Sequence, residues 1–480
     1  MEHHDRDYYP GAWSTGEENT PVSVPPPRQR GRISTGVWLC ILCVVAAVSV
    51  LLTYTLTFAL QRARYSEQLA KQQELIDRLK SESGDDVDPD KLAALSAVFE
   101  RYGYYAGQVD EETMMTAVLK AYAEATGDNY AEYYTEEEYA AMTAENLGEY
   151  VGIGVSIVQT TLSVEGHEYQ VFQIIAIYEN APAEDSELRV GDYIYAVSVN
   201  GVQKTVNEIG YTAAANAVRG EVGSEVTLSA FRKNGDTYDA MELSIIRGTF
   251  EAHSVTYTRS ETDPTVGIVR ISSFDLTTPS QFKTSVNALL SQGVEHFVFD
   301  VRNNPGGDLQ SIKAVLTYFL QEGDLILSAI DKNGEAAHSY VAEVIRLGDE
   351  YAACNVSARE IGMYADLDMV VLCNENTASA AEVFTATLQD YGLATVVGKV
   401  TFGKGIMQSI LPLSYFGNYT GYFKLTTYAY VTKRGVTYHE IGIEPNRKVE
   451  LSDQAKQYNI YLLPEELDDQ LQAAIEQVKQ

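Results

Sequence analysis

Hydrophobic and polar positions change their period along the chain. Between residues 90 and 145, apolar residues recur every three or four positions, as in Leu92, Leu95 and Val98, which predicts amphipathic helices. From Tyr150 the pattern becomes short apolar runs separated by Gly and Asn, with one Ala-rich helical stretch at 208–219. Roughly five short strands and one helix predict a compact β-rich module.

Strands and helices alternate from Val266 onward. In chain order the segments are VGIVRIS (266–272), a helix at 278–291, HFVFDV (296–301), a helix at 308–321, MVVLCN (369–374), a helix at 379–391 and ATVVG (394–398). Such alternation predicts a largely parallel sheet covered by helices on both faces. The chain ends with an antiparallel stretch at 421–432 and an amphipathic tail at 464–478.

One apolar run is long enough to cross a membrane. Residues 37–60 (VWLCILCVVAAVSVLLTYTLTFAL) contain no charged side chain. As a helix they reach about 36 Å, which exceeds the ~30 Å hydrocarbon core of a bilayer. The run is longer than the apolar centre of a signal peptide, so we expect an uncleaved transmembrane anchor. Basic residues lie on both sides of it, so charge alone does not orient the span.

The net charge of the chain makes some classes of binding partner unexpected. The 480 residues carry 35 Lys+Arg against 67 Asp+Glu, a net charge of −32. We therefore expect neither nucleic acid nor an anionic membrane surface as the main partner. The four cysteines, Cys40, Cys43, Cys354 and Cys373, lack the spacing of a zinc site, and we expect no metal and no cofactor.

A serine follows the apolar strand that ends at Cys373. In NENTASAAEVFTATLQDYG (374–392), a turn of small residues leads into a helix, and Ser379 stands at that turn. Its hydroxyl would point to the carboxyl end of the sheet, beside the unpaired N–H groups of the first helical turn. Those groups are donors for a developing oxyanion. The local sequence leaves open that Thr377 or Ser379 only caps the helix.

A lysine between two glycines lies in TFGKGIMQ (401–408). The glycines leave the Lys404 side chain as the only one at that point. A general base near neutral pH needs a lysine pKa of roughly 7–8 rather than about 10.4, and burial is the main source of such a shift. Gln408, four residues later, could hold the amine in place. Taken alone, Gly-Lys-Gly could equally be a surface turn.

A third segment, FVFDVRNNPGGDL (297–309), passes from an apolar strand into a Pro-Gly-Gly turn. The glycines allow a tight turn whose amides can point at a ligand. An amide of Gly306 or Gly307, together with that of Ala380, would complete an oxyanion hole. The alternative for this segment alone is an ordinary Pro-Gly β-turn.

Taken together, these segments resemble the carboxyl-terminal processing proteases, also called tail-specific proteases. The resemblance rests on four blocks in family order, VGIVRISSF, DVRNNPGGDL, TASAAE and TFGKGIMQ, and covers roughly residues 90–450. It implies that Ser379 is the nucleophile, Lys404 the general base and Gln408 the residue that positions the base. It also implies an α/β protease core built from crotonase-like strand–helix repeats.

The β-rich stretch 149–248 resembles a PDZ domain placed before the protease core. The most specific block is NAPAEDSELRVGDYIYAVSVNG (180–201). The resemblance implies that backbone amides of a loop capture a terminal carboxylate while the peptide adds as a β-strand. The residues implied in this contact are Gly152, Ile153, Gly154 and Val155.

The chain departs from the family pattern at two places. Asp128-Asn129 stands where the family usually has Asp-Pro, and Ala181 stands where it usually has serine before the proline. We expect these departures to affect substrate preference rather than catalysis.

The predicted organisation has seven parts. In chain order these are a disordered N-terminal tail (1–36), a transmembrane helix (37–60), a helical stalk or linker (61–89), an N-terminal helical segment (90–148), a PDZ domain (149–248), a Ser-Lys protease core (249–450) and a C-terminal helical tail (451–480).

The resemblance implies a membrane-anchored serine endopeptidase that cleaves proteins near their C-termini. The implied partners are protein substrates with accessible tails, the membrane through 37–60, and a second copy of the chain in a homodimer. The expected location is a bacterial plasma membrane, with the catalytic domain outside the cytoplasm. Two alternatives are a non-catalytic PDZ scaffold (a pseudoprotease) and a binding protein like the retinoid-binding relatives of the fold. The intact set of Ser379, Lys404 and Gln408 disfavours both.

Overall fold

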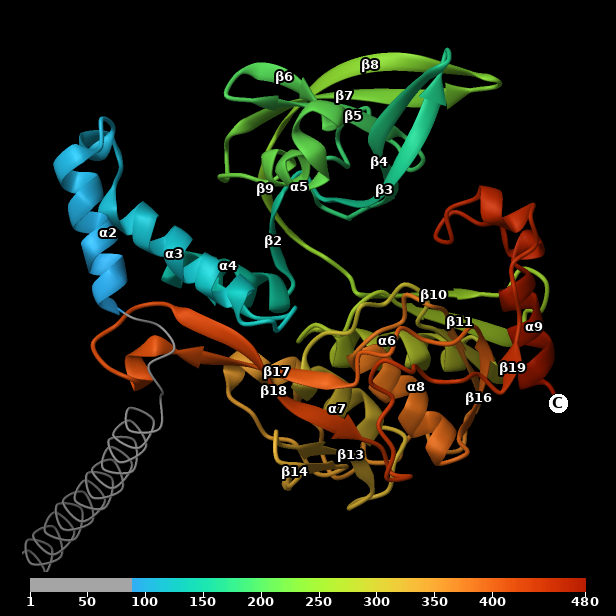
Figure 1. Cartoon of the computed structure of the whole chain (residues 1–480). Coiled ribbons are helices and arrows are strands. Elements are labelled where there is room, and N and C mark those ends of the chain that lie inside the picture. The colour runs from blue at the N-terminus through green and yellow to red at the C-terminus, as the bar shows by residue number, and fades with distance from the viewer. Residues whose placement is uncertain (1–88) are drawn as a thin grey trace, which may run out of the picture. The chain divides into compact units, whose positions relative to one another are not determined.

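The computed structural model describes residues 89–480 (Figure 1). The predicted tail, the span 37–60 and all but the last residue of the stalk lie outside the described residues. Within 89–480, no helix has both the length and the apolar character that a bilayer crossing requires. The chain divides into two compact units, 1–93 and 94–480, and every described strand belongs to the second.

Among the described residues, three α-helices and one strand precede the β-rich module: α2 (Pro89–Tyr102), α3 (Glu111–Ala125), β1 (Glu132–Tyr134) and α4 (Glu136–Asn146). The second and third helices begin at good N-caps. Asp110 accepts a hydrogen bond from the Thr113 N–H, and Thr135 forms a capping box with Glu138.

The prediction of helix throughout 90–145 is wrong at β1. This short strand pairs antiparallel with β18 (Tyr422–Val431), with Tyr133 opposite Phe423. The two strands are far apart in the sequence: Tyr134 of β1 and Lys424 of β18, which are hydrogen-bonded, are 290 positions apart. A local periodicity cannot report a pairing over such a separation.

The β-rich module contains one main sheet and one pair of strands. The sheet has the order β3-β4-β5-β7-β8, with β6 paired to β5, and β2 pairs with β9. The elements are β2 (Glu149–Gly152), β3 (Val155–Val164), β4 (His167–Ile177), β5 (Tyr193–Val199), β6 (Val202–Thr205), α5 (Val206–Val218), β7 (Glu225–Asn234), β8 (Thr237–Ile246) and β9 (Gly248–Glu251). Helix α5 packs Ala214 and Val218 against Phe172 and Ile174 of β4 in one apolar cluster.

The part of the chain predicted as the protease core is built on a six-stranded sheet of order β10-β11-β12-β15-β16-β19. All neighbours are parallel except the edge strand β10, which runs antiparallel to β11. The strands are β10 (Val255–Arg259), β11 (Val266–Ile271), β12 (His296–Asp300), β15 (Asp368–Cys373), β16 (Ala394–Gly398) and β19 (Arg447–Lys448). The predicted parallel sheet is thus confirmed.

Helices cover both faces of this sheet (Figure 1). One face carries α6 (Thr278–Ser291), α7 (Leu309–Thr317) and α8 (Ala380–Asp390), and the other carries α9 (Asp469–Val478). Alternate residues of each strand supply the two clusters. Val269 of β11 points to α6–α8, whereas Ile268 points to α9.

A second sheet has the order β1-β18-β13-β14, with β17 on the other side of part of β18. Its remaining strands are β13 (Leu325–Ile330), β14 (Ala336–Val341) and β17 (Ile406–Pro412). Short 3₁₀ turns complete the chain at Ala106–Gln108, Asp349–Cys354, Leu413–Tyr415, Ala455–Gln457 and Glu465–Leu467. The sheet brings the loop before β17, the strand β18 and the N-terminal segment together.

The helix limits agree with the prediction fully at one helix and only in part at two others. The helix predicted at 278–291 is α6, residue for residue. The helix predicted at 308–321 ends earlier, at Thr317. The tail predicted at 464–478 is helical only from Asp469, because residues 465–467 form a 3₁₀ turn. Helix ends depend on capping and local packing more than on apolar period.

Candidate active site

Ser379 stands where β15 passes into α8, and its backbone is strained. Its φ is 54°, a left-handed value that serine rarely adopts. Two bonds hold the turn: the Ala378 N–H donates to the Asn304 carbonyl oxygen over 2.9 Å, and Thr377 Oγ1 donates to the Val301 carbonyl oxygen over 2.8 Å. The fold therefore presents this serine at the carboxyl end of the parallel strands.

The Pro-Gly-Gly turn packs directly against Ser379. A Cβ atom at Gly306 would lie 2.6 Å from Ser379 Cβ, so only glycine fits there. The buried Asn304 side chain braces the turn: its Oδ1 accepts from the Gly306 N–H over 2.9 Å, and its Nδ2 donates to the Ile271 carbonyl oxygen over 2.9 Å. The Gly306 amide is therefore already occupied by a side chain.

Two backbone N–H groups beside the serine have no partner in the part of the chain that the structure describes. Gly307 forms a parallel bridge with Phe274, but the bond to the Phe274 carbonyl comes from the Asp308 N–H, over 2.6 Å. Ala380 is the first residue of α8, so its N–H has no partner within the helix. Among the described residues, neither the Gly307 nor the Ala380 N–H has an acceptor.

Glu382 joins the serine turn to the lysine loop. Its fully buried carboxylate accepts four hydrogen bonds. The donors are the N–H of Ser379 (2.9 Å), the N–H of Gly403 (2.7 Å), the N–H of Lys404 (2.7 Å) and Thr401 Oγ1 (2.6 Å). Burial raises the pKa of Glu382, and these donors act in the opposite direction.

The Lys404 ammonium lies over an aromatic ring. Its Nζ is 4.3 Å from the centroid of the Tyr130 ring, a cation–π distance. Burial, followed by the positive charge of Lys424, lowers the pKa of Lys404, while Asp128 acts in the opposite direction. Among the described residues, no hydrogen bond joins Lys404 Nζ to the Ser379 hydroxyl.

Tyr430 is a neighbour of Ser379 that sequence reasoning missed. Burial raises the pKa of Tyr430, and a hydrogen bond with the Ser379 side chain lowers it. The Tyr430 N–H donates to the Gly405 carbonyl oxygen over 2.8 Å, which sets the tyrosine beside the lysine loop. No motif in the sequence marks this tyrosine, because only the pairing of distant strands brings it here.

Gln408 lies on β17 and points to β18. Its Nε2 donates to Thr426 Oγ1 over 3.1 Å. Thr426 in turn bonds to Asp128. No hydrogen bond joins Gln408 to Lys404 among the described residues, so its role in holding the amine stays a prediction.

The loop predicted to bind peptides lies at the mouth of a groove of about 340 Å³. Gly152 ends β2, Val155 begins β3, and Gly154 has a φ of 79°. A Cβ atom at Gly154 would lie 2.0 Å from Ala181 Cβ, so this turn requires glycine. The groove is lined by Gly152, Ile153, Gly154 and Val155, and by Phe172, Val218 and Phe250.

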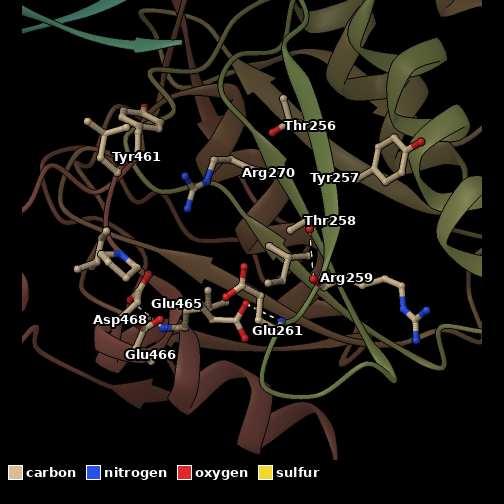
Figure 2. Close-up of a pocket in the computed structure, with 15 residues that line it drawn as sticks. Thr256, Tyr257, Thr258, Arg259, Glu261, Arg270, Tyr461, Glu465, Glu466 and Asp468 are labelled. Carbon is tan, nitrogen blue, oxygen red and sulfur yellow. Dashed lines mark hydrogen bonds between the residues drawn. The ribbon is translucent and has the colours of Figure 1, made fainter. Parts of the chain in front are cut away.

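A different cavity, of about 700 Å³, opens on the α9 face of the core sheet (Figure 2). It is lined by Arg270, Tyr461 and Asp468, among others. The Arg270 guanidinium lies 5.5 Å from the Tyr461 ring centroid and bonds to Asp300 over 2.9 Å. This cavity contains none of the candidate catalytic residues.

Within residues 89–480, the titratable side chains form no metal centre. No group of three or more His, Cys, Asp or Glu within 89–480 has the geometry to hold a metal ion. Cys354 and Cys373 are buried free thiols. Burial raises the pKa of each to about 12, which keeps them protonated.

Comparison with known proteins assigns one part of the chain to a family of peptidases. The model for "Peptidase family S41" matches residues 265–449, the part that carries Ser379, Lys404 and the Pro-Gly-Gly turn. Residues 265–449 thus carry a Peptidase family S41 domain. The resemblance to carboxyl-terminal processing proteases is thereby confirmed.

Curated relatives extend the likeness beyond that domain. The "Carboxy-terminal processing protease CtpA" of Bacillus subtilis is 28% identical over 352 residues, covering 73% of this chain and 67% of the relative. A "Probable CtpA-like serine protease" of Staphylococcus saprophyticus is 28% identical over 347 residues, covering 72% of this chain and 62% of the relative. The chain thus spans about two thirds or less of the length of these relatives.

One solved structure supports the fold. An S41 protease structure from Bacteroides fragilis superposes with a TM-score of 0.51 at 15% sequence identity, covering 83% of this chain and 98% of that one. At this identity the likeness concerns the fold alone.

Proposed function

We propose that this protein is a serine endopeptidase that cleaves proteins near their C-termini, with Ser379 as nucleophile and Lys404 as general base. The observation that carries the proposal is the position of Glu382. One buried carboxylate binds the backbone amides of both residues, over 2.9 and 2.7 Å. It fixes the nucleophile turn and the base loop as neighbours although they are distant in sequence.

The proposed reaction is acyl transfer to serine followed by hydrolysis. The Ser379 hydroxyl attacks the scissile carbonyl carbon, and its proton passes to the neutral Lys404 amine. The N–H groups of Gly307 and Ala380 donate to the oxyanion of the tetrahedral intermediate. As the C–N bond breaks, Lys404 returns the proton to the leaving amine. Water, deprotonated by the same amine, then releases the acyl group from Ser379.

Burial of Lys404 supports the base role. The charged form loses hydration when the side chain is covered, and the nearby positive charge of Lys424 disfavours it further. Both effects increase the fraction of neutral amine at a given pH. Of the glycine amides predicted for the oxyanion, we favour that of Gly307, because the Gly306 N–H already donates to Asn304.

We propose that the module at 149–248 acts as a PDZ domain that selects substrates by their tails. Strand β3 is an edge strand, since its only partner among the described strands is β4. An extended peptide can therefore add to its free edge, with its carboxylate at Gly152–Gly154. Phe172 and Val218 give part of the groove an apolar wall, which favours tails that end in an apolar residue.

The remaining proposals concern location and assembly. We propose that residues 37–60 anchor the chain in a bacterial plasma membrane, with the catalytic part outside the cytoplasm. Support comes from the uncharged run itself. A homodimer is proposed from the family resemblance alone.

The test uses the full chain in detergent and an unstructured substrate protein that ends in apolar residues. We expect wild type to release a C-terminal fragment, and Ser379→Ala and Lys404→Met to lose at least about 10³-fold in rate. Ser291→Ala and Lys433→Met, which change exposed residues of the same types, should cleave like wild type. Cleavage that survives in both catalytic variants would rule out the dyad.

A second arm separates the peptidase from the scaffold. The same substrate ending in two aspartates should be cut more slowly, because the groove is apolar and the tail is charged. If no form cleaves but the apolar tail still binds, the non-catalytic scaffold is the better description.

A further inference from the structure

The segment between α3 and β1 lies against the lysine loop. It contains Asp128 and Tyr130, and it belongs to the part of the chain that precedes the β-rich module. The Tyr130 ring lies 4.3 Å from Lys404 Nζ. The S41 domain begins at residue 265. Tyr130, which lies far before it in the sequence, thus contacts the proposed base.

Hydrogen bonds to β18 fix the position of this segment. Asp128 Oδ2 accepts from the Thr426 N–H over 2.7 Å, and Oδ1 accepts from Thr426 Oγ1 over 3.0 Å. Asp128 Oδ1 also accepts from the Tyr130 N–H over 2.9 Å. One carboxylate therefore ties the aromatic residue to the strand that runs beside the lysine loop.

The same network reaches the residue expected to position the base. Thr426 Oγ1, which donates to Asp128, accepts from Gln408 Nε2 over 3.1 Å. Gln408 is thus connected to the Asp128–Tyr130 segment rather than to Lys404. The amine is contacted by a ring face, and the amide of Gln408 helps to hold the strand that supports that ring.

The geometry points to Asp128 and Tyr130 as positioning residues that hold the Lys404 ammonium in its protonated form. The ring face attracts the charged amine and not the neutral one. The Asp128 charge acts in the same direction. This inference rests on the proposed function, since it concerns the group assigned there as the base.

Charges from several elements act on Lys404. Asp128 and Glu382 favour the ammonium, whereas burial and the positive charge of Lys424 disfavour it. The face of the Tyr130 ring also favours the ammonium. Loss of the ring should therefore shift the balance toward the neutral amine, so that Lys404 loses its proton at lower pH.

The test measures the protonation of Lys404 without using proteolysis. Competitive acetylation by acetic anhydride, followed by mass spectrometry over a pH series, reports the titration midpoint of each lysine. The measurement is made on the full chain carrying Ser379→Ala, so that no self-cleavage interferes. Lys433 lies over the Tyr391 ring and serves as an internal reference.

We expect Tyr130→Leu to lower the Lys404 midpoint by about half to one pH unit. Tyr130→Phe, which keeps the ring face, should leave it unchanged, and Lys433 should not move in either variant. Asp128→Asn removes the charge with little change in shape, and it should also lower the midpoint. This second variant keeps the inference testable if Tyr130→Leu does not fold.

Equal Lys404 midpoints in folded Tyr130→Leu, Tyr130→Phe and Asp128→Asn would overturn the inference. The pH dependence of cleavage, measured with Ser379 restored, separates it from the proposed function. If the titration midpoint of Lys404 shifts and the pH profile of cleavage shifts with it, both the inference and the proposed function are supported. If the Lys404 midpoint shifts while the cleavage profile does not, Asp128 and Tyr130 do stabilise the Lys404 ammonium. In that case the assignment of Lys404 as the base is wrong.

Discussion

The Lys404 N–H donates to Glu382 Oε2 over 2.7 Å, which links the proposed base to the helix that follows the proposed nucleophile. The Glu382 carboxylate is fully buried, and the other groups that hydrogen-bond to it are also N–H or O–H donors. It therefore acts as a common anchor for two loops that must keep a constant separation during proton transfer.

Replacement of this carboxylate should misalign the site. In Glu382→Gln one oxygen becomes an NH₂ group that faces N–H or O–H donors, so hydrogen bonds are lost in a buried place. We expect cleavage to fall at least about 10²-fold and unfolding stability to fall by roughly 2–4 kcal/mol. The measurements are kcat/KM and urea unfolding.

The matched control is Glu375→Gln. Glu375 pairs with Lys399 at the surface, and such exposed pairs contribute at most about 1 kcal/mol. Near wild-type cleavage by Glu382→Gln would show that the anchor is not needed for alignment.

The pH profile should respond to the charge of Lys424. The base must be neutral, so kcat/KM rises with pH through the pKa of Lys404. The Lys424 charge helps to lower that pKa. Lys424→Met removes the charge, raises the pKa of Lys404 and moves the acidic limb to higher pH, by less than about one unit. Lys433→Met should leave the limb in place. A limb that moves to lower pH would contradict the assignment of Lys404.

Gly307 should tolerate no side chain. Its φ is 147°, and a Cβ atom would lie 2.1 Å from the Phe274 carbonyl oxygen. Gly307→Ala must therefore displace the turn that carries one of the two unpaired amides, and we expect a loss of cleavage of about 10²-fold or more. Gly334→Ala is the control, because that glycine also has a positive φ, of 81°, but no atom within 4 Å of the added Cβ. It should lose roughly 1 kcal/mol of stability and keep its activity. Equal activity of both variants would contradict this view of the turn.

A buried ionic network should stabilise the core. Arg302 is 1% exposed and donates to Asp300 over 2.8 Å and to Asp468, at the start of α9, over 2.7 Å. Although burial acts in the opposite direction, Arg302 and Arg270 hold the pKa of Asp300 well below its usual range. Arg302→Met leaves the buried Asp468 carboxylate without its cation and leaves Asp300 with Arg270 alone, and we expect a loss of about 3–5 kcal/mol in denaturant unfolding.

The control for that network is Lys479→Met. Lys479 also ties the C-terminal helix to the core, through Asp263 over 2.6 Å, but its side chain is 47% exposed. We expect a loss of no more than about 1 kcal/mol. Similar losses in the two variants would mean that burial does not distinguish these pairs.

The core of the fold could be predicted because its elements have clear periods. Helix α6 occupies residues 278–291 as predicted, and its apolar positions Phe282, Val286 and Leu289 are fully buried. The parallel strands are apolar runs because helices cover both of their faces. In contrast, β13 and β14 were not predicted. Most of β14 is exposed, and an exposed strand need not carry a strong apolar pattern.

The sequence by itself determined which residues are candidates for chemistry and the order of the elements that carry them. Ser379 follows a buried strand, Lys404 lies between glycines, and both are recognisable because local pattern and motif suffice. Only the tertiary structure decided that Glu382 binds both loops and that Tyr130 covers the lysine. It also decided that the Gly306 amide donates to Asn304, whereas the Gly307 amide has no acceptor within residues 89–480. The contacts of Glu382 and Tyr130 join segments that are separated in the chain. They depend on how sheets and turns pack, which a local pattern of apolar residues does not report.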